Sequence, residues 1–122
     1  MRRTPFGQKT TQRWQAEKEQ MVAFEQLLFL HRVTFWHDYD ARRSKKGWPD
    51  YALFGEGWHA FVELKATSPT TGRRGKVTAE QWQWKTIIEQ GGAEWRTFTL
   101  PDDLDDVNDW LREKTGREVT LT

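Results

Sequence analysis

The sequence predicts one α/β domain, a mixed sheet flanked by helices in the order αβββαβα. Apolar residues recur at helical spacing in three segments, four shorter segments are rich in β-branched and aromatic residues, and a glycine turn joins two of these. The 122 residues include eight Trp and seven Phe, enough for a single hydrophobic core. We expect a flexible N-terminal arm over residues 1–12 and a single domain over residues 13–122.

The first predicted helix and strand precede a basic loop. A helix is expected from Trp14 to Leu30, because one face carries apolar residues at helical spacing: Trp14, Met21, Phe24 and Leu28. Residues 33–40, VTFWHDYD, alternate and are rich in β-branched and aromatic side chains, which predicts a strand. The loop that follows, ARRSKKGW, is basic.

A hairpin is predicted in the middle of the chain. Pro49 can begin a strand but cannot lie in the middle of one, so the second strand is expected over residues 49–54. The glycine turn at residues 55–57 leads into a third strand over residues 58–66. Antiparallel pairing here, with helices elsewhere, predicts a mixed sheet.

The C-terminal part alternates helix, strand and helix. The capping-box pattern from Thr78 to Gln81 begins a predicted helix over residues 78–92, which ends at paired glycines. Residues 93–100 are predicted as the fourth strand. Residues 101–116 carry acids first, basic residues later and a final glycine, the pattern of a third helix.

Composition excludes several classes of protein. Without cysteine there is neither a disulfide framework nor a thiolate zinc site. No stretch resembles a secretory signal or a membrane span, so we expect a cytoplasmic protein with no membrane partner. Residues 1–76 hold 14 Lys and Arg against 8 Asp and Glu, and residues 77–122 hold 5 against 10. The basic part could attract a polyanion, or the imbalance could even out on folding.

Two acids in the predicted hairpin are the candidate functional residues. Alternation places Glu63 and Lys65 on one face of the third strand, about 7 Å apart. Asp50 begins the neighbouring strand and would lie opposite them if the hairpin pairs around its turn. Two facing carboxylates repel unless a cation such as Mg²⁺ joins them. A lysine beside the metal could orient or deprotonate a water, which suits phosphodiester hydrolysis.

A structural alternative exists for each of these residues. Glu63 and Lys65 could lie on a solvated sheet face, with Asp50 capping its strand. The combination favours a functional role, because Asp after Pro, the hairpin, the E-x-K pattern and flanking basic loops occur in one consistent order.

At these residues the sequence resembles a known family. GWPD, FVELKA and TAEQWQWKTIIEQGG are similar to the G-x-P-D, E-x-K and downstream Gln motifs of the virus-type replication-repair nuclease domain, VRR-NUC, of the PD-(D/E)xK nuclease superfamily. The resemblance implies a restriction-endonuclease-like core and Mg²⁺- or Mn²⁺-dependent cleavage of DNA. For small standalone members it also implies a homodimeric Holliday junction resolvase.

The family pattern also implies roles for individual residues. Asp50, Glu63 and the backbone carbonyl of Leu64 would bind the metal, and Lys65 would lie at the attacking water. Such nucleases usually offer another acid from the first helix. Glu17 is our choice, because it shares the apolar stripe with Met21, Phe24 and Leu28, although Glu19 and Glu25 are alternatives.

Gln81 and Trp48 each allow two interpretations. The spacing of Gln81 from Trp84 and Ile88 directs it inward, where the family pattern would put it beside the lysine or a phosphate. Alternatively, it only completes the capping box with Thr78. Trp48 could stack on an unpaired base or belong to the core. The three histidines lack metal-like spacing and are expected to be structural.

Basic loops flank the candidate site and predict contacts to DNA phosphates. The side chains are Arg42, Arg43, Lys45, Lys46, Arg73, Arg74 and Lys76. Each loop alone could instead be solvent-exposed charge.

The expected function is a magnesium-dependent, structure-specific endonuclease of branched DNA, with no nucleotide cofactor. A Holliday junction resolvase acting in DNA repair or recombination, in a bacterium or a phage-infected cell, is the leading form by resemblance. The alternatives are a nuclease of the same fold that cuts flaps, ends or single strands, and a DNA-binding or assembly protein without turnover.

Overall fold

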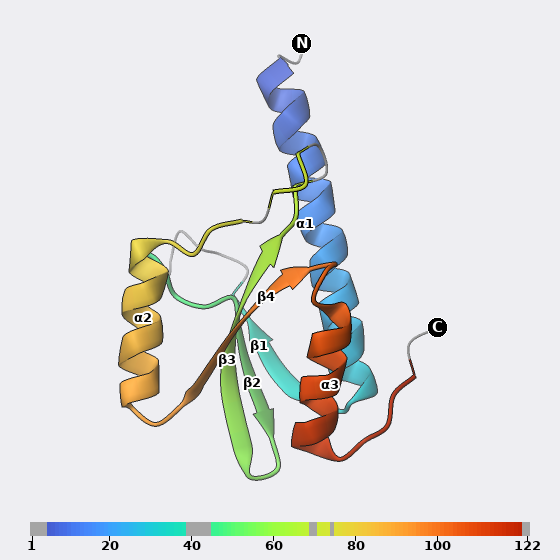
Figure 1. Ribbon diagram of the computed structural model, residues 1–122, viewed down its shortest axis with the longest axis vertical. Coiled ribbons are helices and arrows are strands. Elements are labelled where there is room, and N and C mark those ends of the chain that lie inside the picture. Colours follow the sequence, from blue (N-terminus) through green and yellow to red (C-terminus); the bar gives the residue numbers. More distant parts are fainter. Residues whose placement is uncertain (1–4, 39–44, 69–70, 74, 121–122) are drawn as a thin grey trace.

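The computed structural model describes residues 5–38, 45–68, 71–73 and 75–120, with side chains from Glu17 onward. Within them the protein is an α/β fold, a four-stranded mixed sheet flanked by three helices (Figure 1). The elements in chain order are α1 Pro5–Leu30, β1 Thr34–His37, β2 Tyr51–Gly55, β3 Trp58–Ala66, α2 Ala79–Gln90, β4 Glu94–Leu100 and α3 Leu104–Thr115. None of the helices in these ranges is long and apolar enough to cross a membrane.

The sheet has the order β1-β2-β3-β4, antiparallel between the first three strands and parallel between β3 and β4. The predicted hairpin is confirmed, since Gly55 pairs with Trp58 across a turn of Glu56 and Gly57. Gly57 has φ +78°, a left-handed conformation that glycine adopts without strain. The parallel pair needs a crossover, and α2 supplies it.

Different helices pack on the two faces of the sheet. Helices α1 and α3 lie on one face and α2 on the other (Figure 1). The main core forms under α1 and α3, where buried side chains of both helices meet those of the strands. Alternation in β2 sends Tyr51 and Leu53 into this core and Ala52 to the other face. Burying each large apolar side chain stabilises the fold by about 1.5–3 kcal/mol.

Helix α1 is longer than the sequence analysis predicted. It begins at Pro5, so residues 5–12, expected as part of an N-terminal arm, are helical; residues 1–4 lie outside the described residues. Proline is favourable in the first turn of a helix, and Gln8, Lys9 and Gln12 in this segment are good helix formers. Figure 1 shows the N-terminal half of α1 extending beyond the sheet.

The first two strands are shorter than predicted. Strand β1 covers Thr34–His37, and residues 39 and 40 lie outside the described residues. Strand β2 begins at Tyr51 because Pro49, although buried, has no N–H to donate to the sheet.

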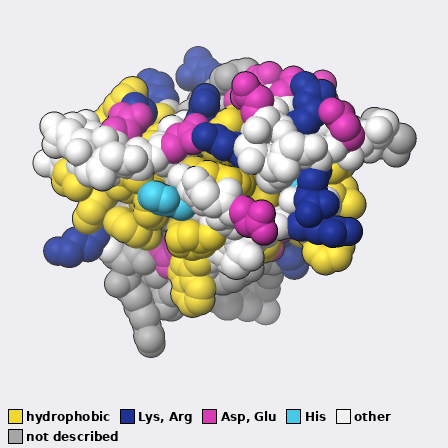
Figure 2. Space-filling model, turned by 90° about the horizontal axis from the view of Figure 1, so that it is seen from below, with side chains coloured by type: hydrophobic (Ala, Val, Ile, Leu, Met, Phe, Trp, Pro, Cys, Tyr) yellow, Lys and Arg dark blue, Asp and Glu magenta, His cyan; other side chains and the backbone are white. Residues whose placement is uncertain are grey.

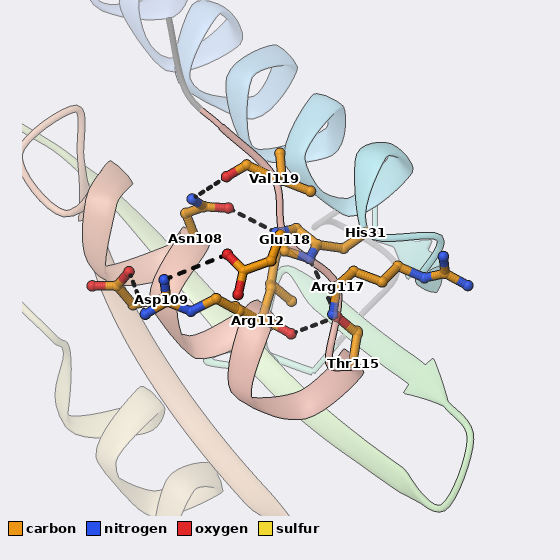
Figure 3. Close-up of polar contacts among 9 residues, drawn as sticks. His31, Asn108, Asp109, Arg112, Thr115, Arg117, Glu118 and Val119 are labelled. Atoms are coloured by element: carbon orange, nitrogen blue, oxygen red, sulfur yellow. Dashed lines mark hydrogen bonds and ion pairs between the residues drawn. The ribbon is translucent and has the colours of Figure 1, made fainter.

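A polar cluster fixes α3 and the C-terminal segment against the end of α1 (Figure 3). His31 is 1% exposed, and its Nε2 lies 2.7 Å from Oδ1 of Asn108. Its Nδ1 lies 3.3 Å from the hydroxyl of Thr115. Asn108 in turn donates to the carbonyl of Val119 at 2.9 Å. Both imidazole nitrogens of His31 therefore have partners in this cluster.

Candidate functional site

The hairpin brings Asp50 and Glu63 together. Tyr51 pairs with Val62, so the next positions outward along the two strands are Asp50 and Glu63. The N–H of Leu64 donates to Oδ2 of Asp50 at 2.9 Å, and Asp38 N–H donates to the carbonyl of Asp50 at 2.9 Å. These two hydrogen bonds hold the Asp50 backbone and carboxylate between β1 and β3.

The Glu63 carboxylate is buried and only partly satisfied. Its side chain is on the α2 face of the sheet, and the residue is 4% exposed. Oε2 accepts a hydrogen bond from Nε2 of Gln81 at 2.7 Å and lies 3.5 Å from Nζ of Lys65. Oε1 is buried and has no hydrogen-bond partner among the described residues. A buried oxygen of this kind is costly unless a proton or a cation satisfies it.

The two carboxyl groups resist ionisation together. Burial raises the pKa of Glu63 to about 8, with the nearby charge of Asp50 raising it further and Lys65 opposing the shift. Burial also raises the pKa of Asp50, while the hydrogen bond from Leu64 lowers it. The pair therefore retains a proton near neutral pH when no cation is present.

A pH-dependent stability follows for the metal-free protein. An acid with a raised pKa binds more protons when folded, so its contribution to stability falls as pH rises from about 4.5 to about 8. Urea unfolding in EDTA should give a lower free energy of unfolding at pH 8 than at pH 5.5. A tenfold change in an acid's ionisation constant on folding changes the free energy of unfolding by about 1.4 kcal/mol. Glu63→Gln should remove most of this decline; the same decline in both proteins would contradict the assignment.

Lys65 is the cation that pairs with Glu63. It lies two residues after Glu63 in β3, on the same face, with its side chain largely buried. The backbone at Gly75 passes beside it, since a Cβ built there would lie 3.4 Å from Cδ of Lys65. The loop between β3 and α2 therefore helps to hold the aliphatic part of this side chain in place.

Gln81 completes the predicted capping box and also reaches Glu63. Its Oε1 accepts from Thr78 N–H at 2.9 Å and its own N–H donates to the Thr78 hydroxyl at 3.1 Å, which completes the capping box. The same side chain donates Nε2 to Glu63. The first turn of α2 therefore fixes the orientation of the Glu63 carboxylate.

The segment before Asp50 packs against α2. Gly47 has φ +87°, and a Cβ there would lie 2.4 Å from the carbonyl carbon of Glu80, so only glycine fits this close approach. The Trp84 indole donates to the carbonyl of Lys46 at 3.2 Å. These contacts join the loop that leads into Asp50 to the helix that carries Gln81.

The helix-one acid that reaches the sheet is Glu25. Glu17 is exposed, so its expected inward orientation is wrong, because burial on the stripe begins only near Met21. Oε2 of Glu25 instead accepts from the Tyr51 hydroxyl at 2.6 Å and lies 3.3 Å from Nδ1 of His37. The structure does not bring Glu17 into any contact with the carboxylate pair.

Sequence reasoning missed His37 and Tyr51 as neighbours of the site. Their rings stack with centroids 4.2 Å apart, and burial lowers the pKa of His37 although the charges of Glu25 and Asp50 oppose the shift. The imidazole is therefore neutral near pH 7. The available signals were that Tyr51 adjoins Asp50 and that alternation directs His37 inward with Phe35.

The predicted DNA-binding side chains that the structure describes lie at the surface. Lys45, Lys46, Arg73 and Lys76 are exposed, and Lys46 forms an ion pair with Glu80 at 3.2 Å. The other predicted DNA contacts, Arg42, Arg43 and Arg74, lie outside the described residues.

The donor set fits a hard divalent cation. In the described part of the chain, no cluster of three or more His, Cys, Asp and Glu side chains could hold a metal. Mg²⁺, however, commonly takes one or two carboxylates and completes its shell with water and phosphate oxygens. Asp50 and the unpartnered Oε1 of Glu63 provide such a pair. Because the N–H and C=O of one strand residue point to the same side, we expect the Leu64 carbonyl to face Asp50 as well.

Comparisons with models of known protein families, with curated proteins and with solved structures give no match to this chain.

Proposed function

We propose that this protein is a metal-dependent nuclease that hydrolyses phosphodiester bonds in DNA. One observation carries the proposal: the half-buried Asp50 lies beside the buried Glu63, one oxygen of Glu63 has no hydrogen-bond partner among the described residues, and a lysine amine lies 3.5 Å from the other. A sheet that needed these residues only for stability would be expected to replace them with apolar side chains, since buried charges are costly.

Each group at the site has a role in this proposal. Asp50, Glu63 and the Leu64 carbonyl would hold Mg²⁺ or Mn²⁺. The bound ion would supply positive charge to the phosphate and make a bound water more acidic. Lys65 would orient the attacking water or accept its proton, and Gln81 holds the Glu63 carboxylate by its hydrogen bond to Oε2. The exposed Lys45, Lys46, Arg73 and Lys76 bind DNA phosphates without reading sequence.

The proposal also includes a family and a substrate. The motifs GWPD and FVELKA support membership of the VRR-NUC type with a restriction-endonuclease-like core. By that resemblance the substrate is branched DNA, with a Holliday junction resolvase of a bacterium or a phage-infected cell as the leading form. Glu17 is not retained as a metal ligand, because it is exposed.

A homodimer is proposed with this assignment, because a four-way junction requires cuts in two strands. Helix α1 offers an exposed apolar surface that supports pairing, formed by Val22, Phe29 and Leu30.

The proposal is tested with end-labelled four-way junction, flap, single-stranded and linear duplex DNA. Cleavage in Mg²⁺ that EDTA abolishes is expected, with the junction or flap cut faster than the duplex. Binding without cleavage in any metal would contradict the enzyme assignment and favour a DNA-binding or assembly protein. Cleavage of single strands alone would contradict the junction assignment and favour the same-fold alternative.

A further inference from the structure

An aromatic surface adjoins the candidate site on the same face of the sheet. Residues opposite one another in a sheet share a face, so the register places Trp36, Ala52 and Phe61 in one row across β1, β2 and β3. Asp50 and Glu63 occupy the next row along the strands. Phe54 and His59 pair in the row on the far side of Phe61.

Most of these rings are open to solvent. Trp36 is 70% exposed, Phe54 is 48% exposed and Trp48 is 36% exposed. Trp48 links the row to α2, since its ring lies 5.8 Å from Phe61 and 4.9 Å from Trp84 between centroids. Helix α2 packs against β4 on this face, and Trp36 of β1 and Phe54 of β2 remain exposed. Figure 2 shows hydrophobic side chains exposed over the end of the molecule seen from below.

The chemistry of this surface fits nucleic-acid bases better than a protein partner. Its exposed large side chains are all rings, separated by Thr34 and Ala52, whereas the exposed surface of α1 includes the aliphatic Val22 and Leu30. Every base has a π-face, so spaced aromatic rings bind single strands without regard to sequence. The exposed Lys45 and Lys46 lie three and two residues before Trp48, where they would neutralise the phosphates of a strand on this surface.

We propose that this surface, which we call the aromatic platform, binds unpaired bases of a DNA strand beside the bond that is cut. Its members are Trp36, Trp48, Phe54, His59 and Phe61. The proposal rests on the proposed function in one respect, that the same strand continues to Asp50 and Glu63. It names the substrate class: branched DNA with unpaired bases at or beside the branch point, bound in preference to fully paired duplex.

The test is binding in EDTA, which separates it from cleavage. Fluorescein-labelled oligothymidine should bind the wild-type protein more tightly than duplex DNA of equal length, measured by anisotropy. Trp36→Ala should weaken oligothymidine binding about 5- to 100-fold, the loss expected for one stacked base. Trp36→Tyr should retain most of the affinity and Trp36→Leu should not, because stacking requires a ring. Trp82→Ala, which removes an exposed ring of α2 outside the platform, is the matched control and should bind normally.

Several results would overturn the platform. If the wild type, Trp36→Ala and Phe54→Ala bind oligothymidine equally well, the platform does not bind bases. If Trp36→Leu binds oligothymidine as tightly as the wild type, the surface is a protein contact. The same conclusion follows if Trp36→Ala changes only the oligomeric state, measured by sedimentation. If the protein cleaves duplex DNA and these variants have no effect on oligothymidine binding, the platform is refuted but the nuclease assignment is not. Loss of oligothymidine binding in Trp36→Ala without cleavage by any form would refute only the nuclease.

Discussion

Replacing Lys65 with alanine is expected to reduce the rate of DNA cleavage by about 10²- to 10⁴-fold, the usual contribution of a positioned acid or base. The amine lies 3.5 Å from Oε2 of Glu63, beside the buried carboxylate pair. The measurement is the single-turnover rate on labelled junction in Mg²⁺, together with junction affinity in EDTA. Affinity should change little, because phosphate binding is assigned to the exposed basic residues.

Lys85→Ala is the matched control for this variant. Lys85 also pairs with a glutamate, at 2.8 Å from Glu89, but on α2 and outside the carboxylate cluster. It should cut at the wild-type rate. Lys65→Arg separates the two roles proposed for the amine, which are to orient the water and to accept its proton. Arginine keeps the charge but does not give up a proton, so it cannot act as the base. Undiminished cleavage by Lys65→Ala would refute the role assigned to the amine.

Asp50→Asn is expected to lose cleavage by at least about 10³-fold, because one charged metal ligand disappears. The change is nearly isosteric, and the amide oxygen of asparagine can still accept the hydrogen bond from Leu64 N–H. The variant should therefore fold. Its stability in EDTA at pH 8 should equal or exceed that of the wild type, because one of two repelling buried acids is removed.

Asp109→Asn provides the corresponding control, since Asp109 is exposed on α3 and pairs with Arg112. It should leave cleavage and stability close to the wild type. If Asp50→Asn folds and cuts as fast as Asp109→Asn, the carboxylate at position 50 is not a metal ligand.

The centre of the candidate site follows from short-range rules. Alternation put Glu63 and Lys65 on one face, and a glycine turn of known length fixed the register that sets Asp50 opposite Glu63. The capping box located the start of α2, and these inferences needed only positions close in sequence. The place of Gln81 beside the site was implied only by the family resemblance, because it depends on how α2 packs on the sheet.

The parts that sequence reasoning missed depend on how a helix rotates and where the sheet beneath it ends. Glu17 shares a stripe with Phe24, but that stripe is buried only where other elements cover it. Glu25 looked marginal on the stripe, yet it reaches Tyr51 and His37 because α1 packs against that edge of the sheet. The exposure of Trp36 could not be predicted either, since a ring in a strand is equally suited to a core.

The central claim is that Asp50 and Glu63 jointly hold a divalent cation at a DNA phosphate. The most direct measurement is Mn²⁺ binding, followed by electron paramagnetic resonance, to the Lys65→Ala protein in complex with branched DNA. We predict saturable binding that is lost when Asp50→Asn is added to Lys65→Ala and retained when Asp109→Asn is added instead. Equal Mn²⁺ binding by the two double variants would contradict the claim.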